Sequence, residues 1–195
     1  MTMTATKRPA GLCCIKDDPA IYVACLASYN NGNLFGYWIN LSVADTKGGI
    51  QECIDWMLQH SPAPGAEEYA VHDSQGLCGP CKGTEQPDLD HLEELAHAYN
   101  VICSDQTEWI AYRMMCNDQN EILTDDAFRD GYCGVHDRPE SYAYELAVER
   151  GHDVDSAKWP FSCIDWEQAW RELSCDGYGA EFSSKAGGYV ITRSA

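Results

Sequence analysis

Residues 20–41, AIYVACLASYNNGNLFGYWINL, carry the pattern that decides the fold. Two runs rich in β-branched and aromatic residues, Ile21–Leu26 and Phe35–Ile39, lie on either side of the turn-forming residues Asn30–Asn33. Such runs around a turn are typical of two neighbouring antiparallel strands. The sequence therefore predicts a β-hairpin here.

The segment after the hairpin completes a small N-terminal domain. Apolar residues recur at helical spacing from Ile50 to Leu58, and Pro62 follows where a helix would end. Residues 1–18 show no periodicity and are interpreted as a flexible tail. We therefore expect an αβ domain over residues 19–62.

Residues 88–99 give the clearest helix signal. Asp88 stands at the N-cap position. The apolar side chains that share one face of this helix are Leu89, Leu92, Leu95, Ala96 and Tyr99. The acidic side chains that share the opposite face are Asp90, Glu93 and Glu94. We expect the first face to pack and the second to carry only negative charge.

The remaining pattern predicts an α+β fold with a mainly helical middle. Further helices are expected at 104–114, from residue 124, at 139–150 and at 165–174, and strands at 67–73, 178–183 and 189–192. We expect an elongated chain of three small domains. These are the N-terminal antiparallel sheet with its helix at 19–62, an acidic central domain at 63–120, and C-terminal helices with an antiparallel hairpin at 121–195.

The charge is the most unusual feature of the composition. The chain has 13 Lys and Arg against 31 Asp and Glu, which gives a formal net charge of -18. Residues 1–64 hold 4 basic and 5 acidic side chains, whereas residues 65–195 hold 9 and 26. A surface of this sign repels nucleic acid and anionic membranes and attracts basic clefts. We therefore expect a basic protein partner.

The acidic residues are spread over predicted folded elements, without the spacing of a calcium loop or the run of a disordered tail. Carboxylates four residues apart on a helix rise by about 6 Å and stay ordered, so they can imitate DNA phosphates. A dimer with twice the charge matches about 60 Å of duplex, or about 18 base pairs. A merely solvated acidic surface is the alternative. The predicted partner-binding carboxylates are Glu67, Glu68, Asp73, Asp88, Asp90, Glu93, Glu94, Asp105, Glu108, Asp118, Glu121, Asp125, Asp126, Asp130, Asp137, Glu140, Glu145 and Glu149.

The motif Cys78-Gly79-Pro80-Cys81 is the sharpest local signal. Its spacing is that of thioredoxin-like oxidoreductases and of half a zinc site. It lacks the preceding aromatic residue of the redox motif, and no second cysteine pair follows at standard spacing. We expect Cys78 and Cys81 to be dispensable thiols and expect no cofactor. A thiol-disulfide oxidoreductase or a metal site at this pair stays the alternative.

No catalytic constellation is visible. The 6 histidines are scattered, and the glycines lack the spacing of a phosphate-binding loop. The odd number of cysteines, 11, and the lack of a signal peptide indicate reduced thiols in a cytoplasm. No segment has the length and hydropathy of a membrane span. We expect a soluble, non-enzymatic protein.

Four blocks of sequence resemble the ArdA antirestriction family, in the family's order. They are residues 20–32 followed by 36–41, Glu67–Asp73, Phe128–Gly134 and Gly187–Ile191. The resemblance implies three small αβ domains in an elongated chain and a curved homodimer that imitates bent B-form DNA. It also implies binding to type I restriction-modification enzymes, at their specificity and methyltransferase subunits. The tail and the cysteine-containing segment Gly76–Pro87 do not match the family's pattern.

Overall fold

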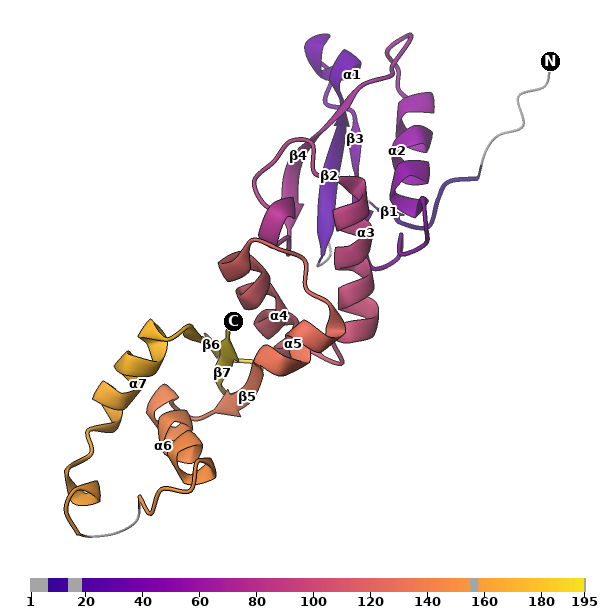
Figure 1. The fold of residues 1–195 in the computed structure, drawn as a ribbon. Helices are drawn as coiled ribbons and strands as arrows, with labels where there is room; N and C mark the ends of the chain where they lie inside the picture. Colours follow the sequence, from indigo (N-terminus) through magenta and orange to yellow (C-terminus); the bar gives the residue numbers. More distant parts are fainter. Residues whose placement is uncertain (1–6, 14–18, 155–157, 195) are drawn as a thin grey trace. The chain divides into compact units, whose positions relative to one another are not determined.

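The computed structural model describes residues 7–13, 19–154 and 158–194. Its contacts divide the chain into two compact units (Figure 1). The N-terminal unit consists of residues 1–103 and 120–122, and the C-terminal unit of residues 104–119 and 123–195. Each unit contains an antiparallel sheet with helices, so the predicted α+β class is confirmed.

The sheet of the N-terminal unit has the strand order β1-β3-β2-β4. Its strands are β1 (Leu12–Cys13), β2 (Ala20–Cys25), β3 (Gly36–Asn40) and β4 (Tyr69–Gln75). Strands β2 and β3 are antiparallel, with Ile21 opposite Ile39, as the sequence predicts.

The connection between β2 and β3 is not the simple turn that the hairpin pattern predicts. A short helix, α1 (Leu26–Asn30), begins directly after Cys25. The Cys25 sulfur accepts a hydrogen bond from the Ser28 amide, and the Asn31 amide donates to the Ser28 carbonyl. These local bonds cap α1, and β2 ends at Cys25, one residue earlier than the sequence predicts.

Helix α2 (Gly49–Gln59) packs against β2 and β3. Its apolar stripe, with Ile50 and Ile54 at its centre, is fully buried, as are Ile21 and Ile39 of the sheet. Burial of each such side chain contributes about 1.5–3 kcal/mol. The predicted helix is confirmed.

Strand β4 is placed by a contact that the sequence does not reveal. It pairs with β2 on the side opposite β3, with Val23 facing Val71. The sheet therefore joins residues on both sides of position 62, where the sequence predicts a domain boundary. The division into three domains stays a prediction.

The N-terminal unit continues with η1 (Gly79–Cys81), α3 (Leu89–His97) and the π-helical turn η2 (Ala98–Ile102). The side chain of Asp88 accepts a hydrogen bond from the Asp90 amide at 2.9 Å, which caps α3 as predicted. Leu92 and Leu95 are fully buried on the face opposite the acidic residues.

The C-terminal unit holds the remaining elements. Its helices are α4 (Gln106–Gln119), α5 (Asp125–Gly131), α6 (Pro139–Glu149), η3 (Phe161–Cys163) and α7 (Trp166–Cys175). Its strands are β5 (Tyr132–His136), β6 (Tyr178–Ser183) and β7 (Gly188–Arg193), in the order β5-β7-β6. The predicted hairpin is confirmed as β6 and β7, whereas β5 is an additional strand that pairs with β7.

Aromatic rings form the core of the C-terminal unit. Trp109 and Tyr112 of α4 are stacked at 5.8 Å between ring centroids, and Tyr112 contacts Phe128 of α5 at 5.5 Å. All three side chains are fully buried. The Tyr112 hydroxyl donates to the Leu123 carbonyl at 2.8 Å and accepts from the Leu123 amide at 3.1 Å. A single hydroxyl therefore holds the α4–α5 connection to the core.

Tyr112→Phe is expected to lower the free energy of unfolding by about 1–3 kcal/mol, because it leaves the buried amide and carbonyl of Leu123 without this partner. The ring remains, so the aromatic packing is retained. Urea denaturation measures the change. Tyr29→Phe is the control. Because Tyr29 is 50% exposed, loss of its hydroxyl should change the free energy of unfolding by less than about 0.5 kcal/mol. An unchanged Tyr112→Phe variant contradicts the prediction.

Candidate acidic interface

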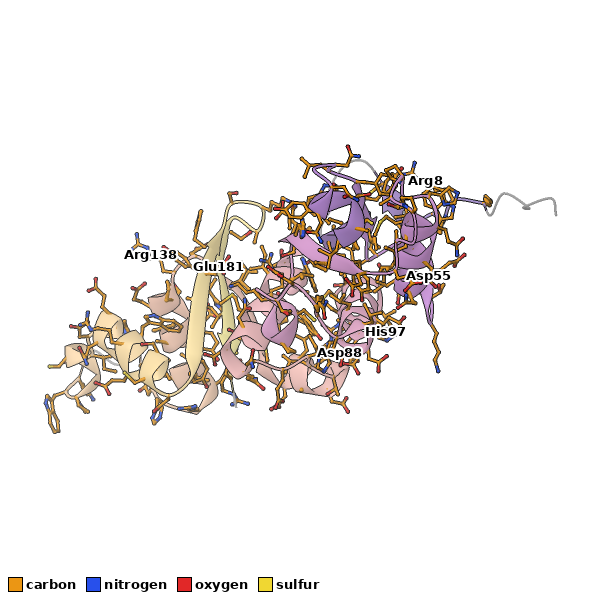
Figure 2. The ribbon with its side chains drawn as sticks, turned by 90° about the horizontal axis from the view of Figure 1, so that it is seen from above. Arg8, Asp55, Asp88, His97, Arg138 and Glu181 are labelled. Carbon is orange, nitrogen blue, oxygen red and sulfur yellow. The ribbon has the colours of Figure 1, made fainter. Side chains whose placement is uncertain are left out.

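The predicted partner-binding carboxylates lie on both units. The N-terminal unit carries Glu67, Glu68, Asp73, Asp88, Asp90, Glu93, Glu94 and Glu121. The C-terminal unit carries Asp105, Glu108, Asp118, Asp125, Asp126, Asp130, Asp137, Glu140, Glu145 and Glu149. All are exposed except Glu93, Glu108 and Glu140, which are half-buried. Figure 2 shows Asp88 among the side chains that surround the ribbon.

The negative charge is divided equally between the two units. The N-terminal unit has 14 acidic and 5 basic residues, and the C-terminal unit has 17 and 8, so each carries a formal charge of -9. In the N-terminal unit most of the excess lies in residues 65–103, which hold 8 acidic side chains and one lysine. The contrast between residues 1–64 and 65–195 in the sequence is therefore not a contrast between the folded units.

Few of these carboxylates are neutralised by neighbours. Within the part of the chain that the structure describes, ion pairs involve only four of the predicted set. Arg129 pairs with Glu108 at 2.9 Å and with Asp125 at 3.2 Å. The other two are Asp130 with Arg193 at 3.4 Å and Glu145 with His136 at 3.2 Å, of which the second is an ion pair only when the imidazole is protonated. Most of the predicted carboxylates thus remain available to a partner.

The acidic residues of helix α3 have two different roles. One carboxylate oxygen of Glu93 accepts a hydrogen bond from the Gly48 amide at 2.8 Å, which ties α3 to the start of α2. Asp90 and Glu94 are exposed, and their carboxylates bond to no other residue that the structure describes. Asp90 and Glu94, rather than the whole predicted triplet, are therefore the better candidates for partner contact.

Many other acidic residues stabilise the starts of helices. Each of helices α2 to α7 has an acidic side chain in its first turn. Asp105 and Asp165 also accept hydrogen bonds from backbone amides in the first turns of α4 and α7. Negative charge at a helix N-terminus is stabilising by about 0.3–1 kcal/mol. These positions therefore stabilise their helices whether or not a partner also contacts them.

Acidic residues at helix ends have no such local explanation. Asp118 lies in the last turn of α4, Glu149 is the last residue of α6, and Asp176 is the C-cap of α7. All three are exposed, and the last turns of these helices contain no basic residue. A negative charge there opposes the helix dipole, at a cost similar to the gain at an N-terminus.

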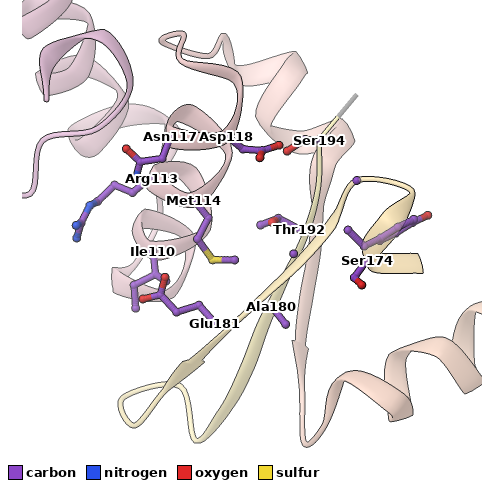
Figure 3. A pocket seen from close by; sticks show the side chains of 13 residues that line it. Ile110, Arg113, Met114, Asn117, Asp118, Ser174, Ala180, Glu181, Thr192 and Ser194 are labelled. Atoms are coloured by element: carbon purple, nitrogen blue, oxygen red, sulfur yellow. The ribbon is translucent and has the colours of Figure 1, made fainter. Parts of the chain in front are cut away.

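Asp118 also lines a cavity of about 520 Å³ between α4 and strands β6 and β7. Figure 3 shows its carboxylate on the side of Ser194, while the guanidinium of Arg113, from the same helix, is directed the other way. The nearest cation of α4 therefore does not neutralise this acidic residue.

Sequence reasoning missed the acidic residues of the last helix and of β6. Glu167 and Glu172 of α7, its C-cap Asp176, and Glu181 of β6 are all exposed. The predicted set ended at Glu149, although the helix expected at 165–174 already contained two of these residues. Applying the charge argument to that helix would have found them.

Cys78 and Cys81 are buried, with exposed fractions of 0% and 1%. They belong to η1 and its N-cap, where the Cys81 amide donates to the Cys78 carbonyl at 3.2 Å, and η1 packs against α3. The 10 cysteines in the described segments form no disulfide, and no three potential ligands there are arranged to hold a metal ion. The pair is thus part of the core, and its substitution would affect packing.

A family model described as antirestriction protein (ArdA) matches residues 21–190, which include most of both units. No curated protein matches the chain significantly. In the described part of the chain, no helix has the length and apolar character required to cross a membrane.

Glu108 is the acidic residue of this surface with the clearest electrostatic role inside the fold. Burial raises the pKa of its carboxyl, but a hydrogen bond from the Ser104 amide and the ion pair with Arg129 outweigh burial, so the pKa lies below its ordinary value. A lowered pKa stabilises the fold above the ordinary glutamate pKa of about 4.3, and this stability is lost as the pH falls through the folded value.

Glu108→Gln should therefore lower the free energy of unfolding by about 1 kcal/mol at pH 7, because it removes the charge from both interactions. The difference from the native chain should shrink as the pH falls from 5 to 3, as urea denaturation at each pH will report. Glu121→Gln, at an exposed residue without an ion pair in the described segments, should leave stability nearly unchanged. A Glu108 effect of the same size at pH 3 would refute this assignment.

Proposed function

Because the chain belongs to the ArdA antirestriction family, we propose that it inhibits type I restriction-modification enzymes by imitating B-form DNA. Family membership implies an inhibitor of restriction rather than an enzyme. The finer proposal is that the carboxylates of both units occupy the positions of DNA phosphates in the DNA-binding groove. The specificity and methyltransferase subunits that form this groove are the proposed partners, in the bacterial cytoplasm.

The observation that carries this proposal is the set of uncompensated carboxylates at helix ends. Asp118, Glu149 and Asp176 oppose the dipoles of their own helices and make no ion pair with a described residue. A solvated surface selected only for stability would favour basic residues there. A surface that must present negative charge to a basic partner keeps acidic residues despite this cost.

The amount of charge suits a segment of duplex. DNA carries one negative charge per about 1.7 Å of its axis, so a chain of charge -18 corresponds to about 30 Å of duplex. A homodimer doubles this length to about 60 Å. We propose that the protein acts as an elongated homodimer.

Two alternatives receive less support from the structure. A thiol-disulfide oxidoreductase needs an accessible thiolate, whereas Cys78 and Cys81 are buried. An acidic adaptor for one basic patch would need its charge on one face of one unit, whereas the charge is divided equally between two units.

Competition with DNA tests the proposed function. The chain is titrated into a purified type I methyltransferase that holds a labelled duplex, at several salt concentrations. We expect stoichiometric displacement of the duplex and an affinity that falls steeply with salt, because many exposed charges contribute. If the duplex stays bound while the protein binds elsewhere, or if sub-stoichiometric protein displaces all of the duplex, DNA mimicry is wrong.

Removing the acidic residues at helix ends should separate stability from inhibition. The triple variant Asp118→Asn, Glu149→Gln, Asp176→Asn is expected to raise the free energy of unfolding by about 1–2 kcal/mol and to weaken binding to the methyltransferase. Thermal or urea denaturation and the competition assay measure the two effects.

The matched control removes the same charge from the first turns of helices, by Glu52→Gln, Asp90→Asn and Asp126→Asn. This control should lose stability, because these acidic residues favour the dipoles of their helices. If the helix-end variant also loses stability, or gains it without any loss of binding, those residues do not serve the partner.

A further inference from the structure

The C-terminal unit contains an open groove, and the imitation of DNA phosphates by surface carboxylates does not explain its presence. Its volume is about 1200 Å³, and it lies between the first half of α6, the first turns of α7, and Tyr189 of β7. This volume exceeds the 300–1000 Å³ of ordinary small-molecule sites. A groove of this size fits a segment of polypeptide.

Aromatic rings form one part of its lining. Tyr144 of α6 and Trp166 of α7 meet edge to face at 5.2 Å between ring centroids. Trp170 and Tyr189 also line the groove, and all four side chains are only half-buried. The groove therefore presents aromatic rings to an occupant. Imitation of DNA phosphates does not require such rings.

Carboxylates form the rest of the lining. Five acidic residues line the groove: Asp137, Glu140, Glu145, Asp165 and Glu167. Among the residues that the structure describes, Arg138 is the only basic one that lines it, and Figure 2 shows its side chain extending away from the ribbon. The lining thus has a net charge of -4.

The two helix starts do not reverse this sign. Helices α6 and α7 both begin at the groove, and each N-terminus contributes about +0.5 of a charge. The groove then remains at about -3, which favours a cation over an anion.

Three of the five carboxylates, those of Asp137, Glu140 and Glu167, are available for an occupant. Asp165 caps α7 through the Gln168 amide at 3.0 Å, and Glu145 contacts His136. The carboxylates of Glu140 on α6 and Glu167 on α7 bond to no other residue in the described segments. These two carboxylates lie on different elements that line the same groove.

We propose that this groove binds an arginine-bearing segment of the partner protein, with a guanidinium over the aromatic rings and in contact with Glu140 and Glu167. Guanidinium is planar and weakly hydrated, so it stacks on aromatic faces and pairs with carboxylates better than an ammonium does. The inference rests on the proposed function for the identity of the partner. It adds a local anchor to an otherwise distributed electrostatic surface.

Short peptides test the groove without any restriction enzyme. The full chain is titrated by calorimetry with tetra-arginine, tetra-lysine and the uncharged isostere tetra-citrulline. We expect the order arginine, lysine, citrulline in affinity. Tyr144→Leu keeps every charge. It should weaken the binding of tetra-arginine by roughly 2- to 30-fold, the range of a cation–π contact, and should change the binding of tetra-lysine less.

A second variant protects the test against misfolding of the first. Glu140→Gln with Glu167→Gln changes only the groove carboxylates and should weaken the binding of tetra-arginine by roughly 2- to 30-fold. The control Glu52→Gln with Glu85→Gln removes the same charge from exposed residues of the N-terminal unit that lie outside the predicted partner-binding set, and it should change the binding of tetra-arginine less than about 2-fold. If the groove and control variants weaken the peptide equally, or if arginine and lysine bind alike to the native chain, the groove is not an arginine site.

Inhibition assays separate this inference from the proposed function. If the native chain does not compete with DNA for the methyltransferase, the proposed function fails, whatever the peptides show. If the native chain competes with DNA and Tyr144→Leu competes equally well, the proposed arginine-binding groove is wrong, whereas the proposed DNA mimicry is unaffected. A weaker Tyr144→Leu competitor with selective loss of tetra-arginine binding supports the anchor.

Discussion

Repulsion between like charges is the constraint on which the rest of this structure depends. Each unit folds with a formal charge of -9, and the described residues of the predicted acidic set make only four ion pairs. Two small cores must therefore offset the repulsion. In the C-terminal unit, Trp109, Tyr112 and Phe128 supply large buried rings, and a paired hydroxyl holds the chain to them.

The helices determine which acidic residues are costly. Acidic residues in first turns stabilise their helices, so they carry no cost to the fold. Acidic residues at helix ends lower the stability of their helices, and these are Asp118, Glu149 and Asp176. The carboxylates of Glu93 and Glu108 accept hydrogen bonds inside the fold. The acidic surface thus combines carboxylates that stabilise the fold with carboxylates whose only favourable interaction would be with a basic partner. In the groove of the C-terminal unit, aromatic rings add a contact that charge alone does not provide.

Local patterns in the sequence predict α2, α3 and the pairing of β2 with β3, because periodicity and caps act over a few residues. Contacts between distant residues escape such patterns. Strand β5 has only five residues and follows α5 directly, and β4 joins β2 from beyond the predicted boundary at position 62. The equal division of charge and the groove between α6 and α7 also depend on which distant segments fold together. Exposed carboxylates were predictable by type, but their bonding to Gly48 or Ser104 was not.

The most direct test of the account is an electron cryomicroscopy structure of the chain bound to a type I methyltransferase. The account predicts that carboxylates of both units lie within about 4 Å of the lysine and arginine side chains that contact phosphates in the DNA complex of the same enzyme. It also predicts that these contacts follow the path of the duplex. A complex in which the protein lies outside the DNA groove, or in which one unit alone reaches it, would contradict the account.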